Sequence, residues 1–189
     1  MIFPPHKYKK IMLIIGATLL LVGSGIYLYT HFFSQKESYV RTAPVISRDI
    51  VGEAGNMVFT IKDVEVPLRE GTATVEGIPG TIKMMSASLE IDFNKDSVMD
   101  RAVIIKNERD DGSMYFYVSV VIVGSDNTLS NTNTILLGEG VLIQRMIELP
   151  DNMFSVEYLD RKSPKDTPSL KKKRTFKVEG YTLTEIVKK

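Results

Sequence analysis

Beyond residue 56 the chain consists of short apolar runs separated by turn residues every roughly 8 to 14 positions, a pattern typical of an all-β domain. One run alternates strictly, and its apolar side is formed by Met85, Ala87, Leu89, Ile91 and Phe93. The intervening Ser86, Ser88 and Glu90 are polar, as expected for the solvent side of a half-buried strand. We therefore expect one mainly β, antiparallel domain over residues 57–189.

Two other runs, 102–105 and 115–123, are apolar on both faces and so predict central strands. The polar segment 107–112 between them predicts an antiparallel hairpin. Further hairpins are expected from strands 140–148 and 153–159 and from strands 175–178 and 181–186. Residues 141–149 also fit a helical period, and segments 125–134 and 161–174 predict irregular structure, the latter with a basic run at 171–174.

Residues 11–30 carry no charged side chain and predict a membrane-spanning helix. Twenty residues at 1.5 Å each span about 30 Å, the thickness of a hydrocarbon core. Lys7, Lys9 and Lys10 precede this segment, so we expect a cytoplasmic N-terminus (1–10), a juxtamembrane tether (31–56) and a C-terminal domain outside, periplasmic or extracellular. A cleaved secretory signal, with Gly23-Ser-Gly25 as its cleavage site, is the alternative. Either way the domain is exported from the cytoplasm.

Composition excludes several classes of site. The chain has no cysteine, which rules out disulfides, thiolate metal sites and cysteine nucleophiles. Its formal net charge is +1, with no basic surplus of the kind that binds nucleic acid. The two histidines, His6 and His31, both flank the predicted helix, so a histidine-based catalytic triad within the domain is excluded.

The segment 92–100 has the spacing of a calcium-binding loop. Side-chain oxygens stand at relative positions 1, 3, 5 and 9 in Asp92, Asn94, Asp96 and Asp100, and the backbone carbonyl of Val98 stands at position 7. Ca²⁺ prefers such hard oxygen ligands, and three crowded carboxylates repel one another without a cation. The spacing therefore predicts a structural Ca²⁺ site.

Two positions depart from the usual loop. Ser97 occupies position 6, where glycine is usual, and Val103 replaces the bidentate acid at position 12. The coordination shell would then need water or a distant acid, such as Asp110 or Glu70, and the implied dissociation constant is roughly 10⁻⁴ to 10⁻³ M. The alternative is an acidic turn that uses Asp and Asn for their turn-forming geometry.

From about residue 56 onward the chain resembles an uncharacterised family of exported bacterial proteins built around an Asp-x-Asn-x-Asp-Gly-x-x-Asp loop. The loop itself is similar to the calcium loops of FG-GAP and dockerin repeats. The likeness is carried by four segments, at 92–105, 112–120, 134–138, and 156–161 with 174–180. It implies calcium binding at Asp92, Asn94, Asp96 and Asp100 and brings no enzymatic activity.

These observations favour a non-catalytic module, anchored in the lipid bilayer by residues 11–30, that contacts another envelope protein or a polymer. An accessory subunit of a larger membrane complex is the main alternative. An exported hydrolase is a third hypothesis, with Ser86, Ser88 and Glu90 as its candidate residues because they share a strand face.

Overall fold

The computed structural model describes residues 50–163 and 165–187, and the predicted anchor at 11–30 lies outside them. Contacts divide the chain into two units, 1–47 and 48–189, and the described residues belong to the second. This unit is mainly β, with antiparallel sheets, as the sequence predicts. Its one helix, α2 (Ile50–Ala54), is short, and no described helix has the length and apolar character needed to cross a bilayer.

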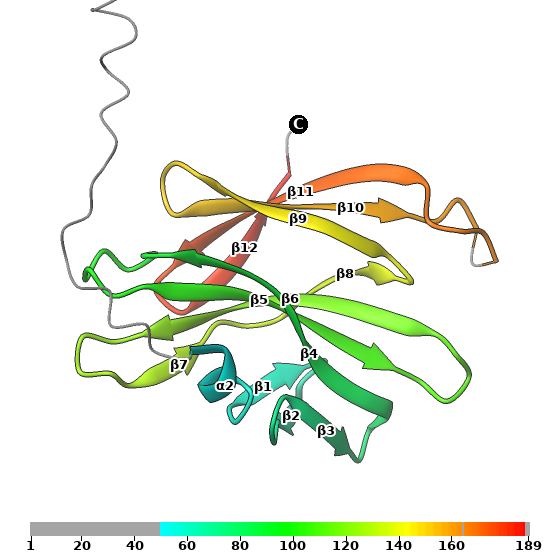
Figure 1. Cartoon of the computed structure of the whole chain (residues 1–189), viewed down its shortest axis with the longest axis horizontal. Coiled ribbons are helices and arrows are strands. Elements are labelled where there is room, and N and C mark those ends of the chain that lie inside the picture. Colours follow the sequence, from blue (N-terminus) through cyan, green and yellow to red (C-terminus); the bar gives the residue numbers. More distant parts are fainter. Residues whose placement is uncertain (1–49, 164, 188–189) are drawn as a thin grey trace, which may run out of the picture. The chain divides into compact units, whose positions relative to one another are not determined.

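A six-stranded sheet forms the centre of the unit (Figure 1). Its strand order is β3-β4-β5-β6-β7, and β8 pairs with the part of β6 that β7 leaves free. The strands are β3 (Thr72–Val75), β4 (Ile78–Ile91), β5 (Asp100–Glu108), β6 (Met114–Val123), β7 (Leu129–Asn131) and β8 (Ile135–Glu139). The long β4 changes register between Met84 and Ser88.

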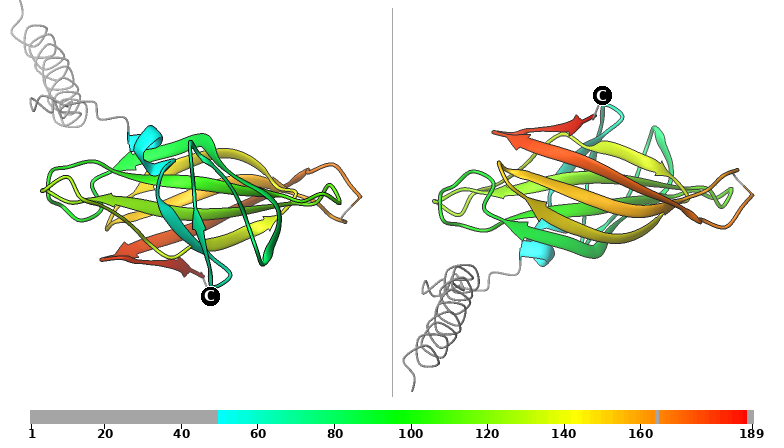
Figure 2. Two further views of the ribbon diagram at one scale, coloured as in Figure 1. Left: turned by 90° about the horizontal axis from the view of Figure 1, so that it is seen from below. Right: turned by 90° about the horizontal axis from the view of Figure 1, so that it is seen from above.

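Smaller layers cover both faces of this sheet (Figure 1). On one side lies a four-stranded sheet of order β12-β11-β10-β9, formed by β9 (Leu142–Leu149), β10 (Met153–Asp160), β11 (Leu170–Glu179) and β12 (Thr182–Ile186). On the other side lie α2 and the hairpin of β1 (Val58–Ile61) and β2 (Val64–Pro67). Figure 2 shows the four-stranded sheet running roughly along the central hairpin, whereas β1 crosses it.

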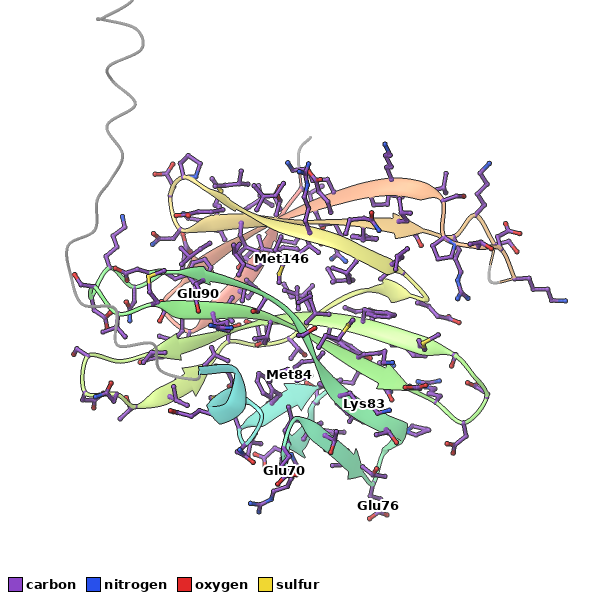
Figure 3. All side chains as sticks on the ribbon, viewed as in Figure 1. Glu70, Glu76, Lys83, Met84, Glu90 and Met146 are labelled. Carbon is purple, nitrogen blue, oxygen red and sulfur yellow. The ribbon has the colours of Figure 1, made fainter. Side chains whose placement is uncertain are left out.

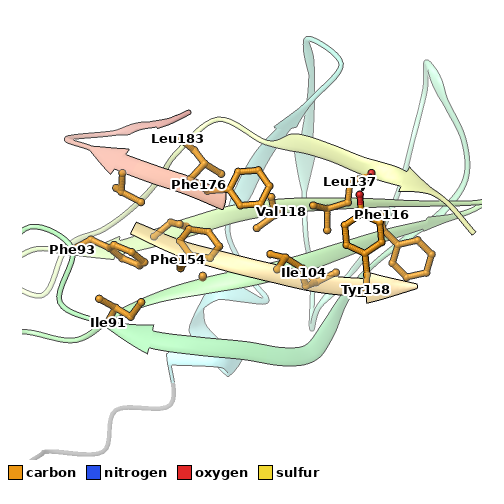
Figure 4. Close-up of a cluster of buried hydrophobic side chains, with 14 of the residues drawn as sticks. Ile91, Phe93, Ile104, Phe116, Val118, Leu137, Phe154, Tyr158, Phe176 and Leu183 are labelled. Carbon is orange, nitrogen blue, oxygen red and sulfur yellow. Dashed lines mark hydrogen bonds between the residues drawn. The ribbon is translucent and has the colours of Figure 1, made fainter. Parts of the chain in front are cut away.

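The central hairpin β5–β6 contributes alternate side chains to two hydrophobic cores. The core beneath the four-stranded sheet is shown in Figure 4 and includes Ile104 and Val118 together with Phe93, Phe154 and Phe176. The second core lies against α2 and β1–β2 and contains Val103, Ile105, Tyr117, Val121 and Val123. In Figure 3, Met146 and Met84 lie on the two sides of the six-stranded sheet, one in each core. This arrangement confirms the prediction that both runs are buried on both faces.

Side-chain amide and guanidinium groups join the two sheets where strands do not pair. Asn133 Nδ2 donates to the carbonyl of Leu183 at 3.1 Å, and its Oδ1 accepts from the Leu183 N–H at 2.8 Å. Arg174 donates to the carbonyls of Leu136 and Leu137 at 2.6 and 3.1 Å and pairs with Glu185. These contacts link β11 and β12 to the β8 side of the central sheet.

Several sequence predictions need correction. Residues 50–56, predicted as tether, belong to the fold, because α2 is helical and Ala54 is buried in the second core. Residues 142–149 form strand β9, so the helical alternative is wrong. Segment 125–134 contains β7, and β11 already begins at Leu170. The basic run at 171–174 therefore lies on a strand, where alternate side chains face opposite sides and form no continuous basic loop.

Candidate calcium site in the loop between β4 and β5

The acidic loop connects β4 with β5 and is held at both ends by buried side chains. Phe93 packs in the first core against Phe154, with ring centroids 5.6 Å apart. Val98 packs against the second core on the opposite face of the sheet. The loop thus wraps around the end of the sheet with its backbone positions fixed by rigid flanks.

Three of the predicted ligands, Asp92, Asn94 and Asp96, come together within the loop. The backbone N–H of Asp96 donates both to Asp92 Oδ1 and to Asn94 Oδ1, each at 3.1 Å. Asn94 Nδ2 donates to Asp96 Oδ2 at 3.0 Å. Asp92 Oδ2 accepts from the N–H of Ser97 at 3.0 Å, and Asp96 Oδ1 accepts from the N–H of Val98 at 2.8 Å. The side-chain oxygens therefore face the inside of the turn.

Asp100 points instead into the protein interior and is 0% exposed. Its Oδ2 accepts from the N–H groups of Phe93 and Asn94 at 2.8 and 3.3 Å, and its Oδ1 accepts from that of Val123 at 2.8 Å. Burial raises the pKa of this carboxyl to about 6, although the three N–H donors act in the opposite direction. Asp100 thereby connects the loop, β5 and the end of β6.

The four side chains differ in how many of their acceptor sites are already used in hydrogen bonds. An ionised carboxylate offers about four acceptor sites. Asp100 already uses three for backbone N–H groups, whereas Asp92 uses two. Asp92, Asn94 and Asp96 thus retain acceptor capacity toward a cation, while Asp100 has little to add. Within residues 50–163 and 165–187, however, no three acidic or histidine side chains converge closely enough to form a metal cluster.

The backbone conformation agrees with that of a loop that favours glycine. Ser97 has φ 70°, in the left-handed region, and Lys95 has φ 60°. A non-glycine residue there costs roughly 1 to 2 kcal/mol. The N–H of Ser97 donates to Asp92 Oδ2, and the N–H of Val98 donates to Asp96 Oδ1 as in an Asx turn, so both bonds favour this conformation.

The distant acids suggested to complete the shell lie elsewhere. Asp110 follows β5 at its far end, and the nine residues of that strand span about 30 Å. Glu70 lies in the turn before β3, where its neighbour Gly71 accepts from the N–H of Met84 in the middle of β4, away from the loop at the end of that strand. Val103 is buried in the second core. Further ligands would therefore have to be water molecules.

The candidate hydrolase residues form a structural contact. Ser88 accepts a hydrogen bond from Arg101 Nη1 at 3.1 Å, and the same guanidinium pairs with Glu90. Both acceptors lie on β4 beside β5, where Glu90 pairs in register with Arg101. This partner of Ser88 and Glu90 was not identified from the sequence, although antiparallel pairing across the loop places Arg101 opposite Glu90.

Comparison of the chain with known protein families, with curated proteins and with solved structures finds no match.

Proposed function

We propose that this chain is a membrane-anchored, non-catalytic module of the cell envelope. Residues 11–30 hold the β domain outside the cytoplasm, the loop 92–100 carries a weak structural Ca²⁺ site, and the domain contacts another envelope protein or a polymer. The apolar N-terminal segment supports the anchor, and the β unit supports the contact role.

The contact function is supported chiefly by the outer face of the four-stranded sheet. Phe154, Val156 and Tyr158 point into the first core, so the alternate residues of β10 point away from it. Register places Ile147 and Thr175 on either side of Ser155 on this outer face. In the part of the chain that the structure describes, no helix or strand lies over it (Figure 1).

This outer face carries an aliphatic patch beside a row of charges. The outer patch comprises Ile147, Leu149, Met153 and Ile186 around Ser155 and Thr175. Next to it, Glu157 pairs with Arg145 at 2.7 Å and with Lys173 at 3.3 Å. An apolar centre with a polar border is the arrangement found in protein interfaces. It supports a contact role for this sheet.

The partner is tested by purifying the tagged full chain from its own cells in mild detergent. We expect a co-purifying partner that is lost when Ile147→Lys places a charge in the patch. Val58→Lys is the matched control, because Val58 is 50% exposed on β1, in the opposite layer. A stoichiometric membrane partner would favour the accessory-subunit version. Equal partner recovery from the wild type and the Ile147 variant would contradict the assigned surface.

The calcium part is tested by thermal unfolding of the full chain in millimolar Ca²⁺ and in chelator. We expect Ca²⁺ to raise the melting temperature of the wild type, since a ligand that binds only the folded state stabilises it. Asp92→Asn should abolish the rise. Asp126→Asn should retain it, because Asp126 forms an acidic turn with Thr128 elsewhere in the chain. An unchanged wild-type melting temperature would remove the ion from the proposal.

A further inference from the structure

A second polar cluster lies at the other end of β5, where the central hairpin turns. It consists of Asn107, Arg109, Tyr115, Tyr117 and Lys62, here called the Tyr115 cluster. Asn107 pairs in register with Tyr115, and Tyr117 follows two residues later on the same face of β6. Lys62 approaches from the turn between β1 and β2. The central hairpin and the β1–β2 turn, which is distant from it in the sequence, thus contribute to one location.

Two cations of the cluster share one aromatic ring. The guanidinium carbon of Arg109 lies 4.3 Å from the centroid of the Tyr115 ring, and Lys62 Nζ lies 5.3 Å from it. Among the described residues no carboxylate forms an ion pair with either side chain. Glu139, opposite Tyr115 on β8, is exposed and leaves both cations unpaired. By contrast, Lys83 on β4 and Lys106 on β5 both pair with Glu108. Hydrogen bonds from Ser113 and the charge of Arg109 lower the pKa of Asp111, so this exposed carboxylate acts on Arg109 without forming an ion pair with it. The cluster therefore holds two cations that no ion pair neutralises.

Beneath these cations lie buried polar groups without partners. Asn107 is 0% exposed and Tyr117 is 2% exposed. Within the described residues, seven buried side-chain polar atoms lack a hydrogen-bond partner, and four of them belong to this cluster: both amide atoms of Asn107, Arg109 Nε and the Tyr117 hydroxyl. Folded proteins seldom leave such groups unpaired, and their concentration in one place points to a ligand.

The chemistry of the unpaired groups defines that ligand. Arg109 Nε, Asn107 Nδ2 and the Tyr117 hydroxyl are hydrogen-bond donors, and only Asn107 Oδ1 is purely an acceptor. Burial raises the pKa of Tyr117 while the charge of Arg109 opposes this rise, so the phenol is a neutral donor within the field of the guanidinium. Three donors and two cations call for oxygen acceptors that carry negative charge.

We propose that the Tyr115 cluster binds a small oxyanion of the carboxylate or phosphate class. The anion reaches Asn107 and Tyr117 by replacing the Tyr115 ring as the partner of Lys62 and Arg109. Lys62 is exposed and Arg109 half-buried, so both side chains are able to move without disturbing a core. This site is separate from the acidic loop, which lies at the opposite end of β5, and it does not depend on Ca²⁺.

The test uses the full chain in detergent micelles with chelator present, so that calcium plays no part. Sodium phosphate and sodium acetate are each titrated against sodium chloride at constant ionic strength. Thermal unfolding and tyrosine fluorescence are recorded, the latter because the chain has no tryptophan. We expect a saturable rise in melting temperature with one or both oxyanions. A response to phosphate alone, to acetate alone or to both supports the proposal and identifies the anion class.

Variants locate the response. Arg109→Gln and Lys62→Gln should each weaken the apparent affinity about tenfold, the effect of losing one charge-assisted bond. Lys172→Gln is the matched control, since Lys172 is exposed on the four-stranded sheet without an ion pair, and it should respond as the wild type does. No difference between either oxyanion and chloride in the wild type would overturn the proposal. So would an unchanged affinity in both the Arg109 and the Lys62 variants.

Discussion

The buried carboxyl of Asp100 should make the stability of the domain depend on pH in a specific direction. Its pKa in the folded protein is about 6, compared with 3.8 as the ordinary value. The difference of about 2 between these values corresponds to roughly 3 kcal/mol. Because the folded state keeps the proton to higher pH, this stability is fully present below pH 3.8 and is lost as the pH rises through 6.

Asp100→Asn isolates this contribution, because asparagine has nearly the same shape and does not titrate. Denaturant unfolding of the full chain is followed in chelator at pH 4, 5, 6 and 7. We expect the free energy of unfolding of the wild type, relative to the variant, to fall by roughly 2 kcal/mol across this range, because pH 4 already lies above the ordinary value of 3.8. Asp126→Asn is the control and should show the opposite sign, since bonds from Thr128 lower the pKa of the exposed Asp126 carboxyl. Parallel wild-type and Asp100→Asn profiles, or a rise with pH, would show that the three N–H donors outweigh burial.

Three further substitutions test individual contacts. Ser97→Gly should raise the free energy of unfolding by up to about 1 kcal/mol relative to Ser97→Ala, because only glycine adopts the left-handed conformation without strain; equal stabilities would contradict this. Arg174→Lys should lower the free energy of unfolding by roughly 1 to 3 kcal/mol in chemical denaturation, since lysine cannot reproduce the paired bonds to Glu185. An unchanged value would mean that the Arg174–Glu185 pair adds no stability. Asn133→Ala should accelerate hydrogen exchange of the Leu183 amide by at least about tenfold, because it removes the acceptor of that N–H; unchanged exchange would refute the bond.

The strands that could be predicted are those whose apolar pattern follows directly from burial on one face or on both faces of a sheet. Residues 102–105 and 115–123 are apolar on both faces, apart from the buried Ser119, because each strand contributes to two cores. The alternation from Met85 to Phe93 reflects a single buried face. The first half of β4 was not predicted, because Pro79 and Gly80 resemble a turn. Gly80 is needed there because a Cβ atom would overlap the backbone of Glu108 on the neighbouring strand. A close approach between strands cannot be recognised from one strand alone.

The candidate loop was predicted in part for a similar reason. Hydrogen bonds within the loop bring Asp92, Asn94 and Asp96 together, because a short turn determines their relative positions. The spacing alone makes Asp100 a ligand equivalent to these three residues. In the structure, however, its carboxylate is buried and accepts from the N–H of Val123, which is distant in the sequence. The Tyr115 cluster gave no local signal, since its residues come from two strands and a separate hairpin turn. Only the pairing of strands reveals such a group.

The β5–β6 hairpin contributes side chains to both hydrophobic cores, and this affects how the described unit unfolds. Here the same two strands form one wall of each core, so the loss of either core leaves an apolar sheet face open to water. We therefore expect the two outer layers to share one cooperative transition, in which lost packing on one side of the sheet also destabilises the layer on the other side.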